Sequence, residues 1–296
     1  MKPPAAGAER HRERQACGVT SIRRGTTETA GSAEGAMSAA YDRSARMWLS
    51  GPEPIYRHFA RALVRAAPRP LAGLRILDLG AGTGTVSKEL RRVGACPVAV
   101  DASPAMLKKA RGCVPELPVV ASEALRLPVA GGSFDGSVSG FLLNHVPQPH
   151  RLLVEAARVT RRGGVLLAMT FAAGDLHPAT KAVEGVAAAW GWQAPAWYHD
   201  QRSWAALTDT HAGLRTQAER ACLPAVEVFS IEVDVGLLTP LELVSWRLGH
   251  AHMADFAMAL SASDLRRLMA EAEAALGPSP QRLCRQLLIL SSHLPA

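Results

Sequence analysis

Three glycines on alternate positions follow an apolar run in ILDLGAGTGTVS, residues 76–87. Gly80, Gly82 and Gly84 lack Cβ atoms, so the backbone can take unusual dihedral angles and a ligand can approach the main chain. Asp101 ends the next apolar run, VAVDAS, about twenty residues further on. A carboxylate there can accept hydrogen bonds from both hydroxyls of a ribose, and it also suits a helix N-cap. The pattern indicates a nucleoside site, with a tight strand-to-helix turn as the structural alternative.

The spacing of the glycines separates two classes of nucleoside ligand. A dinucleotide fold favours GxGxxG, because the pyrophosphate lies on a helix N-terminus. Here the third glycine comes one residue early, as GxGxG. A nucleoside without phosphates needs only a tight loop around its ribose and an amino-acid tail. This interpretation favours S-adenosylmethionine over a nicotinamide dinucleotide.

The segments around these residues alternate between strand and helix patterns. Apolar runs that end near turn residues predict strands, and apolar residues at helical spacing predict helices. This alternation is typical of a mostly parallel sheet with helices on both faces. The expected strands are 74–80, 96–103, 117–124, 133–146, 164–172, 225–236 and 285–294, and the main helices are 38–67, 85–94, 104–113, 149–164, 239–260 and 261–277.

The composition divides the chain into a tail and one large domain. Residues 1–36 lack apolar periodicity, so we expect a disordered N-terminal tail. Residues 37–296 carry the α/β pattern. Within this domain, the strand rhythm breaks at 173–222, which we expect to form a substrate cap insertion, and 237–278 is expected to be a helical segment.

Four ordered segments together resemble class I S-adenosylmethionine-dependent methyltransferases, in particular the small-molecule branch that includes quinone-biosynthesis enzymes. The segments are ILDLGAGTG, VAVDASPAML, LPVAGGSFDGSVSGFLLNHV and EAARVTRRGGVLLAMTF. The resemblance covers about residues 38–172 and the last two strands. It implies a doubly wound, seven-stranded Rossmann-like α/β sheet that is mostly parallel, with the last strand antiparallel and a helical cap inserted.

The resemblance also implies roles for individual residues toward S-adenosylmethionine. The glycine loop would wrap the methionine part and the ribose, with Asp78 fixing it from beneath and Asp101 binding the ribose. Glu123 stands where the family has an Asp that bonds the adenine amino group, which alters the reach of this contact. The full set of implied cofactor residues is Tyr41, Asp78, Gly80, Ala81, Gly82, Gly84, Asp101, Ala102, Met106, Glu123, Ala124 and Phe141.

His145 is the best-placed ionisable group for catalysis. It follows the fourth strand, and its ordinary pKa suits a general base. Such a base is needed only where the nucleophile must lose a proton, and a pocket-shaping role is the alternative. His250 is a candidate for lining the substrate. At i, i+2 on a helix, His250 and His252 would face different ways, and no metal-ligand spacing occurs in the sequence, so we expect no metal site.

The segment after residue 172 is rich in aromatic residues. Trp190, Trp197 and Tyr198 lie between the fifth and sixth strands, where an insertion overhangs the carboxyl ends of the sheet. They either form the core of the cap or line an apolar substrate pocket. The second interpretation predicts a lipophilic or aromatic small-molecule substrate.

Composition restricts the remaining possibilities. The formal net charge is +7, yet the basic residues are scattered, so a nucleic-acid partner is not expected. The five cysteines form no CxxC pair, which favours free thiols in the cytoplasm. Without an apolar run of about 18 to 20 residues or a secretory signal, no membrane association is expected. We expect a monomer or homodimer.

These observations predict an S-adenosylmethionine-dependent methyltransferase. Its acceptor would be an O, N or C atom of a lipophilic or aromatic small molecule, in secondary metabolism. The alternative is an enzyme of the same fold that couples methylation to a cyclisation of the substrate, or replaces methylation by it.

Overall fold

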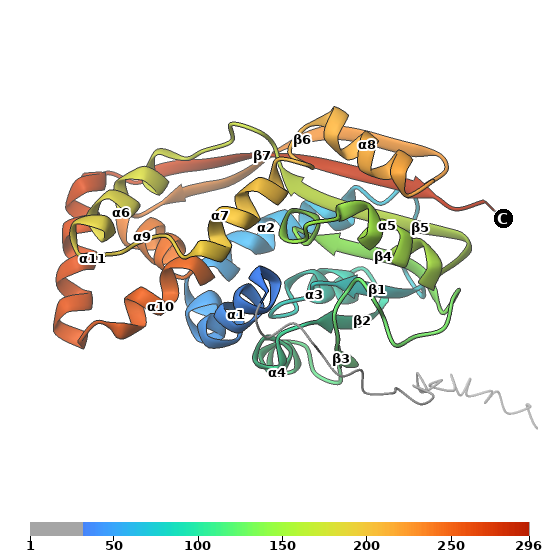
Figure 1. Cartoon of the computed structure of the whole chain (residues 1–296), viewed down its shortest axis with the longest axis horizontal. Coiled ribbons are helices and arrows are strands. Elements are labelled where there is room, and N and C mark those ends of the chain that lie inside the picture. Colours follow the sequence, from blue (N-terminus) through green and yellow to red (C-terminus); the bar gives the residue numbers. More distant parts are fainter. Residues whose placement is uncertain (1–31, 296) are drawn as a thin grey trace, which may run out of the picture.

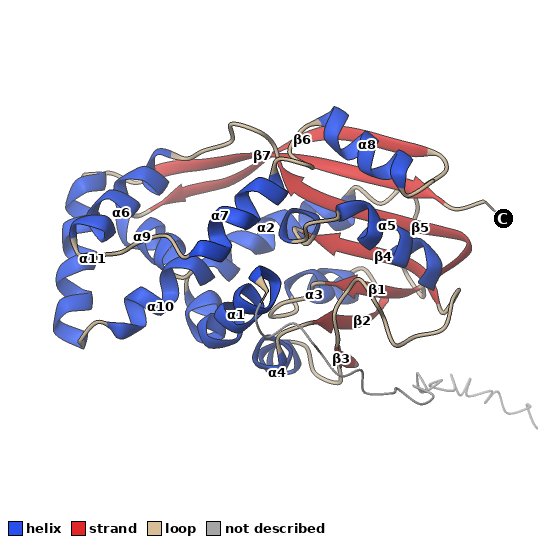
Figure 2. Cartoon of the chain, in the orientation of Figure 1, coloured by secondary structure: helices blue, strands red, loops and turns tan. Residues whose placement is uncertain are grey.

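The structure of the chain, a computed structural model, describes residues 32–295. Seven strands form one sheet in the order β3-β2-β1-β4-β5-β7-β6 (Figure 2). All neighbouring strands are parallel except β7, which runs antiparallel to both β5 and β6. The predicted fold class is therefore confirmed. The strands are β1 Arg75–Leu79, β2 Cys96–Asp101, β3 Val119–Ala121, β4 Phe134–Gly140, β5 Thr160–Phe171, β6 Val226–Leu238 and β7 Gln281–His293.

Helices cover both faces of the sheet, because alternate strand residues point to opposite sides. In β1, Ile76 belongs to the apolar cluster formed with α2 and α3, whereas Leu77 belongs to the cluster formed with α5 and α8. The helices are α1 Ala33–Ser50, α2 Pro52–Arg65, α3 Thr85–Arg92, α4 Pro104–Cys113, α5 Pro149–Val159, α6 Pro178–Ala189, α7 Ala196–Ala205, α8 His211–Arg220, α9 Pro240–Leu248, α10 Ala251–Ala259 and α11 Ala262–Leu276.

The helix expected over 38–67 is two helices, α1 and α2. The helix is interrupted at Gly51, where an added Cβ would lie 2.2 Å from the carbonyl oxygen of Ser245. Pro52 then opens α2, since proline lacks the N–H that would continue a helix. At its other end, α1 starts at Ala33, and the Ser32 side chain accepts a hydrogen bond from the Gly35 N–H at 3.1 Å. The rest of the expected N-terminal tail lies outside the described residues.

Four helices form a separate group at one end of the molecule. Figure 1 shows α6, α9, α10 and α11 together where β6 and β7 project beyond the other strands. Their shared apolar cluster includes Val183, Val244, Met253 and Leu268, each essentially inaccessible. By contrast, α8 packs on the sheet beside α5, through Leu214 and Ala218. Within the expected cap 173–222, therefore, α6 and α7 lie near the ends of the strands and α8 belongs to the sheet layer.

None of the helices in residues 32–295 combines the length and the apolar character needed to cross a membrane.

Alanine substitutions in the glycine loop would test how strongly its backbone conformation requires glycine. Gly82 and Gly84 have positive φ angles of 54° and 82°, which strain any L side chain. An added Cβ at Gly84 would lie 3.0 Å from the Ala110 Cβ, whereas one at Gly82 would meet no atom within 4 Å. We expect Gly82→Ala to cost about 1 to 2 kcal/mol of unfolding free energy and Gly84→Ala clearly more. Urea denaturation of both variants measures this, and equal losses would contradict the difference in packing.

Candidate active site

A large cavity lies at the carboxyl ends of the parallel strands, where open α/β sheets bind ligands. Its volume is about 1,710 Å³, larger than the roughly 300 to 1,000 Å³ of a usual small-molecule site. The glycine loop, the ends of β2 and β4, and helices α1, α7 and α9 all contribute lining residues. The cavity therefore has room for two ligands side by side.

Most of the predicted cofactor residues come together in this cavity. The lining residues among them are Tyr41, Gly80, Ala81, Gly82, Asp101, Ala102, Met106, Glu123, Ala124 and Phe141. Asp78 and Gly84 are not among the lining residues: Asp78 lies beneath the loop, and Gly84 closes the turn into α3. Both residues shape the loop and do not face the cavity.

Asp101 fixes the loop and the following helix at once. Its Oδ2 accepts a hydrogen bond from the Gly82 N–H at 2.8 Å, and its Oδ1 accepts one from the Ser103 N–H at 2.8 Å. Each carboxylate oxygen has a second lone-pair direction, so both can still accept a hydroxyl from a ligand. The two functions considered from the sequence, capping and ribose binding, are thus compatible with one geometry.

Asp78 is buried, and only part of its carboxyl group is satisfied. Oδ2 accepts the Ser87 hydroxyl at 2.6 Å, while Oδ1 has no hydrogen-bond partner among the described residues. Burial raises the pKa of Asp78 to about 7, although the Ser87 hydrogen bonds oppose this shift. Asp78 thus ties β1 to the start of α3 and holds the loop in place.

Helix α1 closes over the cavity through two polar contacts. Asp42 Oδ1 accepts the Ser103 hydroxyl at 2.7 Å and the Ala105 N–H at 2.8 Å, which joins α1 to the start of α4. The Tyr41 hydroxyl lies 2.9 Å from Nε2 of His145. The sequence pattern around Asp42 carries no motif for this clamp, and only the structure reveals it.

His145 sits between two fixed partners. Its Nδ1 lies 2.6 Å from the carbonyl oxygen of Phe141, which can only accept, so the ring proton belongs on Nδ1. Nε2 is then the acceptor for the Tyr41 hydroxyl. Burial lowers the pKa of His145 to about 4, so the ring is neutral at pH 7. Phe141 itself has a positive φ of 66°, a strained conformation that the His145 bond helps to hold.

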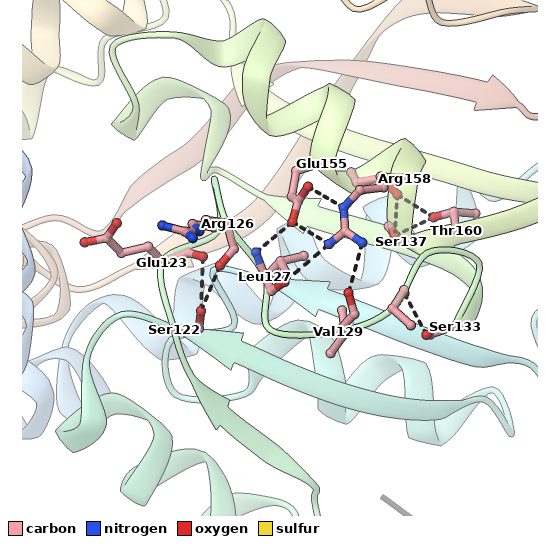
Figure 3. A network of polar contacts seen from close by, with 12 residues as sticks. Ser122, Glu123, Arg126, Leu127, Val129, Ser133, Ser137, Glu155, Arg158 and Thr160 are labelled. Carbon is pink, nitrogen blue, oxygen red and sulfur yellow. Dashed lines mark hydrogen bonds and ion pairs between the residues drawn. The ribbon is translucent and has the colours of Figure 1, made fainter. Parts of the chain in front are cut away.

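The loop after β3, which carries Glu123, is clamped to α5. Figure 3 shows Glu155 accepting the Leu127 N–H at 2.7 Å and Arg158 donating to the Val129 carbonyl at 2.9 Å, while the carboxylate of Glu123 points away from this network. Glu155 and Arg158 also form an ion pair at 2.7 Å. These contacts hold the loop at Leu127 and Val129, and Glu123, four residues before Leu127, lines the cavity.

Beyond Phe141, aromatic and basic side chains enclose the other end of the cavity. We call this part the acceptor compartment; it is lined by Tyr56, Phe171, Trp246, Arg247, His250 and Arg285. The rings of Phe141 and Phe171 are stacked at 4.4 Å between centroids. The predicted residues Trp197, Tyr198 and His250 also line the cavity. Arg247 and Arg285 could not be identified from the sequence, because isolated arginines carry no spacing pattern.

We expected Trp190 to line the substrate pocket, but it does not line the cavity. Its indole N–H donates to Glu271 at 2.6 Å, and its ring lies under the Arg267 guanidinium at 5.0 Å. It packs between α6 and α11 as part of the helical group. Of the aromatic residues after residue 172, Trp190 therefore packs in the helical group, whereas Trp197 and Tyr198 line the cavity.

The expectation that His250 and His252 face different ways is wrong. Their ring centroids are 5.7 Å apart, and both residues line the cavity. The helix expected over 239–260 ends at Leu248, and His250 is the N-cap of α10, outside any helix. Helical geometry therefore does not separate the two rings. In the region that the structure covers, no group of three or more His, Cys, Asp or Glu residues could hold a metal ion.

Comparisons with known proteins agree with this geometry. Residues 77–168 match the family described as "Methyltransferase domain". A curated relative, a demethylmenaquinone methyltransferase of Renibacterium salmoninarum, is 39% identical over 118 residues, which are 40% of this chain and 48% of the relative. The chain thus spans about half the length of the curated relatives it matches.

Two solved structures share the fold. One is a Haemonchus contortus phosphoethanolamine N-methyltransferase 2 in complex with S-adenosyl-L-methionine, at 18% identity, with a TM-score of 0.52 over 91% of this chain and 59% of that one. The other, from Anabaena variabilis, is described as "Putative methyltransferase from antibiotic biosynthesis pathway" and has 17% identity, with a TM-score of 0.54 over 78% of this chain and 95% of that one.

The raised pKa of Asp78 predicts a pH-dependent stability. A carboxyl whose pKa is higher in the folded than in the unfolded state stabilises most below its unfolded value, and this contribution is lost as the pH rises through the folded value. We therefore expect the wild type to lose unfolding free energy relative to Asp78→Asn between about pH 4 and pH 7. Urea denaturation at several pH values measures the difference. If the difference in unfolding free energy between the wild type and Asp78→Asn is constant across this pH range, the Asp78 carboxyl does not titrate as predicted.

Proposed function

We propose that the chain transfers a methyl group from S-adenosylmethionine to an O, N or C atom of a lipophilic or aromatic small molecule. Residues 77–168 match the family described as "Methyltransferase domain", and the motifs of the chain resemble class I S-adenosylmethionine-dependent enzymes. The observation that carries this proposal is one continuous cavity that joins the glycine loop and Asp101 to an aromatic compartment. Secondary metabolism, as the setting of this reaction, is part of the same proposal.

The loop residues fit the proposed cofactor. The position beside Gly82 where a Cβ would stand is free of atoms within 4 Å, so a ligand can lie against this backbone. Asp101 offers two carboxylate oxygens for ribose hydroxyls, while Ala102 and Met106 supply an apolar surface for a base. Glu123 is the acceptor proposed for the adenine amino group. Bound S-adenosylmethionine would supply an activated methyl on a positively charged sulfur.

Phe141 and His145 would stand near the methyl donor, at the boundary between the two halves of the cavity. A neutral His145 whose Nε2 already accepts from Tyr41 is a weak base, since its pKa is lowered to about 4. We therefore favour a positioning role for this pair: it holds α1 over the cavity and excludes water. Most of the acceleration would come from orientation of the two substrates. A proton transfer to His145 would serve only an acceptor that must lose a proton.

The sequence also allows a cyclisation reaction. None of the contacts in the cavity favours or disfavours it, so it stays a prediction. A product whose mass lacks the added methyl group would favour it.

The cofactor assignment predicts a specific loss on changing Asp101. Asp101→Asn keeps the side-chain size and removes one of the two acceptor oxygens, so we expect affinity for S-adenosylmethionine to fall about tenfold or more. Isothermal titration calorimetry measures the affinity. Asp135→Asn is the matched control, because Asp135 also accepts a backbone N–H, from Arg75 at 2.7 Å, but does not line the cavity. Unchanged affinity in Asp101→Asn, or no binding to the wild type, would overturn the assignment.

The positioning role of Tyr41 predicts a split between binding and chemistry. Tyr41→Phe keeps the edge-on ring contacts with Trp48 and His145 but removes the hydroxyl. We expect a roughly fivefold loss of cofactor affinity, from one hydrogen bond of about 1 kcal/mol. The turnover at saturating cofactor should change less. Calorimetry and steady-state kinetics measure the two quantities, and a large fall in turnover at unchanged affinity would instead favour proton transfer through the pair.

A further inference from the structure

Two arginines are buried in the wall of the acceptor compartment. Arg247 of α9 is 6% exposed and Arg285 of β7 is 8% exposed, and both line the cavity. A buried guanidinium is costly unless it is paired and hydrogen-bonded. Two such groups at one end of a cavity therefore call for a physical explanation.

Each arginine has one carboxylate partner and keeps a free donor. Arg247 Nη2 donates to Glu184 and to the Tyr198 hydroxyl at 3.3 Å. Arg285 donates from Nε to Oδ2 of Asp175 at 2.6 Å and from Nη2 to the Asp175 carbonyl at 3.1 Å. Neither Nη1 has a hydrogen-bond partner within residues 32–295, and neither is sealed from solvent. Each guanidinium thus keeps an accessible Nη1 with unused N–H donors.

The two guanidinium groups act on the same part of the compartment. Burial, together with the charges of Arg247 and, less strongly, Arg285, lowers the pKa of His250 to about 3. Arg285 also lies 4.2 Å from the centroid of the Phe171 ring and 5.8 Å from that of Trp246. Guanidinium donors and aromatic rings therefore line the same compartment.

The charge balance indicates what these donors can bind. Glu184 and Asp175 compensate the two arginines, so the compartment supplies directed donors without a large net positive charge. A planar group with one negative charge and two acceptor oxygens matches this arrangement better than a phosphate dianion. The rings of Tyr56 and Phe171 are perpendicular, with centroids 6.3 Å apart. Phe141 and Arg285 lie against the Phe171 ring, so an aromatic body would meet ring edges there, which attract the face of another ring.

We propose that the acceptor substrate is an aromatic carboxylic acid, with its carboxylate held by Arg247 and Arg285 and its ring against Tyr56 and Phe171. This inference rests on the proposed function, because it names the substrate class of the same cavity. The competing interpretation is purely structural: Arg247 ties α9 to α6, and Arg285 ties β7 to the segment before α6. Structural ion pairs would give no preference between a charged and a neutral ligand.

The test compares acids with their neutral amides on the full chain saturated with S-adenosylhomocysteine. The probes are 2-naphthoate with 2-naphthamide and indole-3-carboxylate with indole-3-carboxamide, measured by isothermal titration calorimetry. We expect at least one acid to bind about tenfold or more tightly than its amide, as for hydrogen bonds to a charged group. Equal binding within both pairs, or no binding of either acid, overturns the proposal.

Two methionine variants locate the source of this preference. Arg247→Met leaves Glu184 able to hydrate, since its side chain is 28% exposed, and should reduce the acid preference to threefold or less. Arg282→Met is the matched control: Arg282 pairs with Asp234 on the surface and does not line the cavity, so its preference should stay unchanged. Equal loss in both variants contradicts the proposal.

Two further measurements separate the possible failures. Arg247→Lys keeps the charge but loses the planar fork of donors, so we expect an acid preference between those of the wild type and Arg247→Met. A preference in this lysine variant that equals the wild-type value rejects the planar donors as its cause. Failure of the wild type to bind S-adenosylhomocysteine would reject the proposed function itself, whereas cofactor binding without an acid preference rejects only the substrate class.

Discussion

The fixed position of His145 is the constraint on which the cavity depends. Its Nδ1 donates to the Phe141 carbonyl at the end of β4, and its Nε2 accepts from Tyr41 of α1. One side chain thereby joins the edge of the sheet to the helix that covers it. The same contact holds Phe141 in its left-handed conformation, which places its ring between the glycine loop and the acceptor compartment. His145 therefore supports both Phe141, which divides the cavity, and α1, which covers it.

The loop half of this site could be predicted from the sequence because its geometry is local. A glycine needed at positive φ and a carboxylate at the end of the next strand leave marks at fixed distances along the chain. Gly80, Gly82 and Asp101 accordingly line the cavity as expected. Asp78 shows the limit of this reasoning, since the sequence identifies it at the end of the strand but does not reveal its hydrogen bond to Ser87.

The acceptor half could be predicted only in part, because its residues come from segments far apart in the chain. His250 lines the cavity as expected, but Tyr56, Arg247 and Arg285 lie on α2, α9 and β7, and no spacing rule relates them. The break between α9 and α10 shows why periodicity misleads here. Apolar residues continue through 239–260, yet Gly249 packs so closely on Pro52 that an added Cβ would lie 2.4 Å from its Cδ. Tertiary packing ends the helix there and turns both histidines toward the cavity.

This division has a consequence for how the site can change. The glycine loop is held by backbone contacts to Asp101 and by β1, so a substitution there disturbs the sheet itself. The acceptor compartment draws Arg247 from the helical group, whose apolar core is separate from the two clusters that cover the sheet. Substitutions at such positions alter the donors and the shape of the compartment with little strain on the loop. A scaffold of this kind can therefore keep its glycine-loop site while the charge and size of the ligand that fits the other end of the cavity vary.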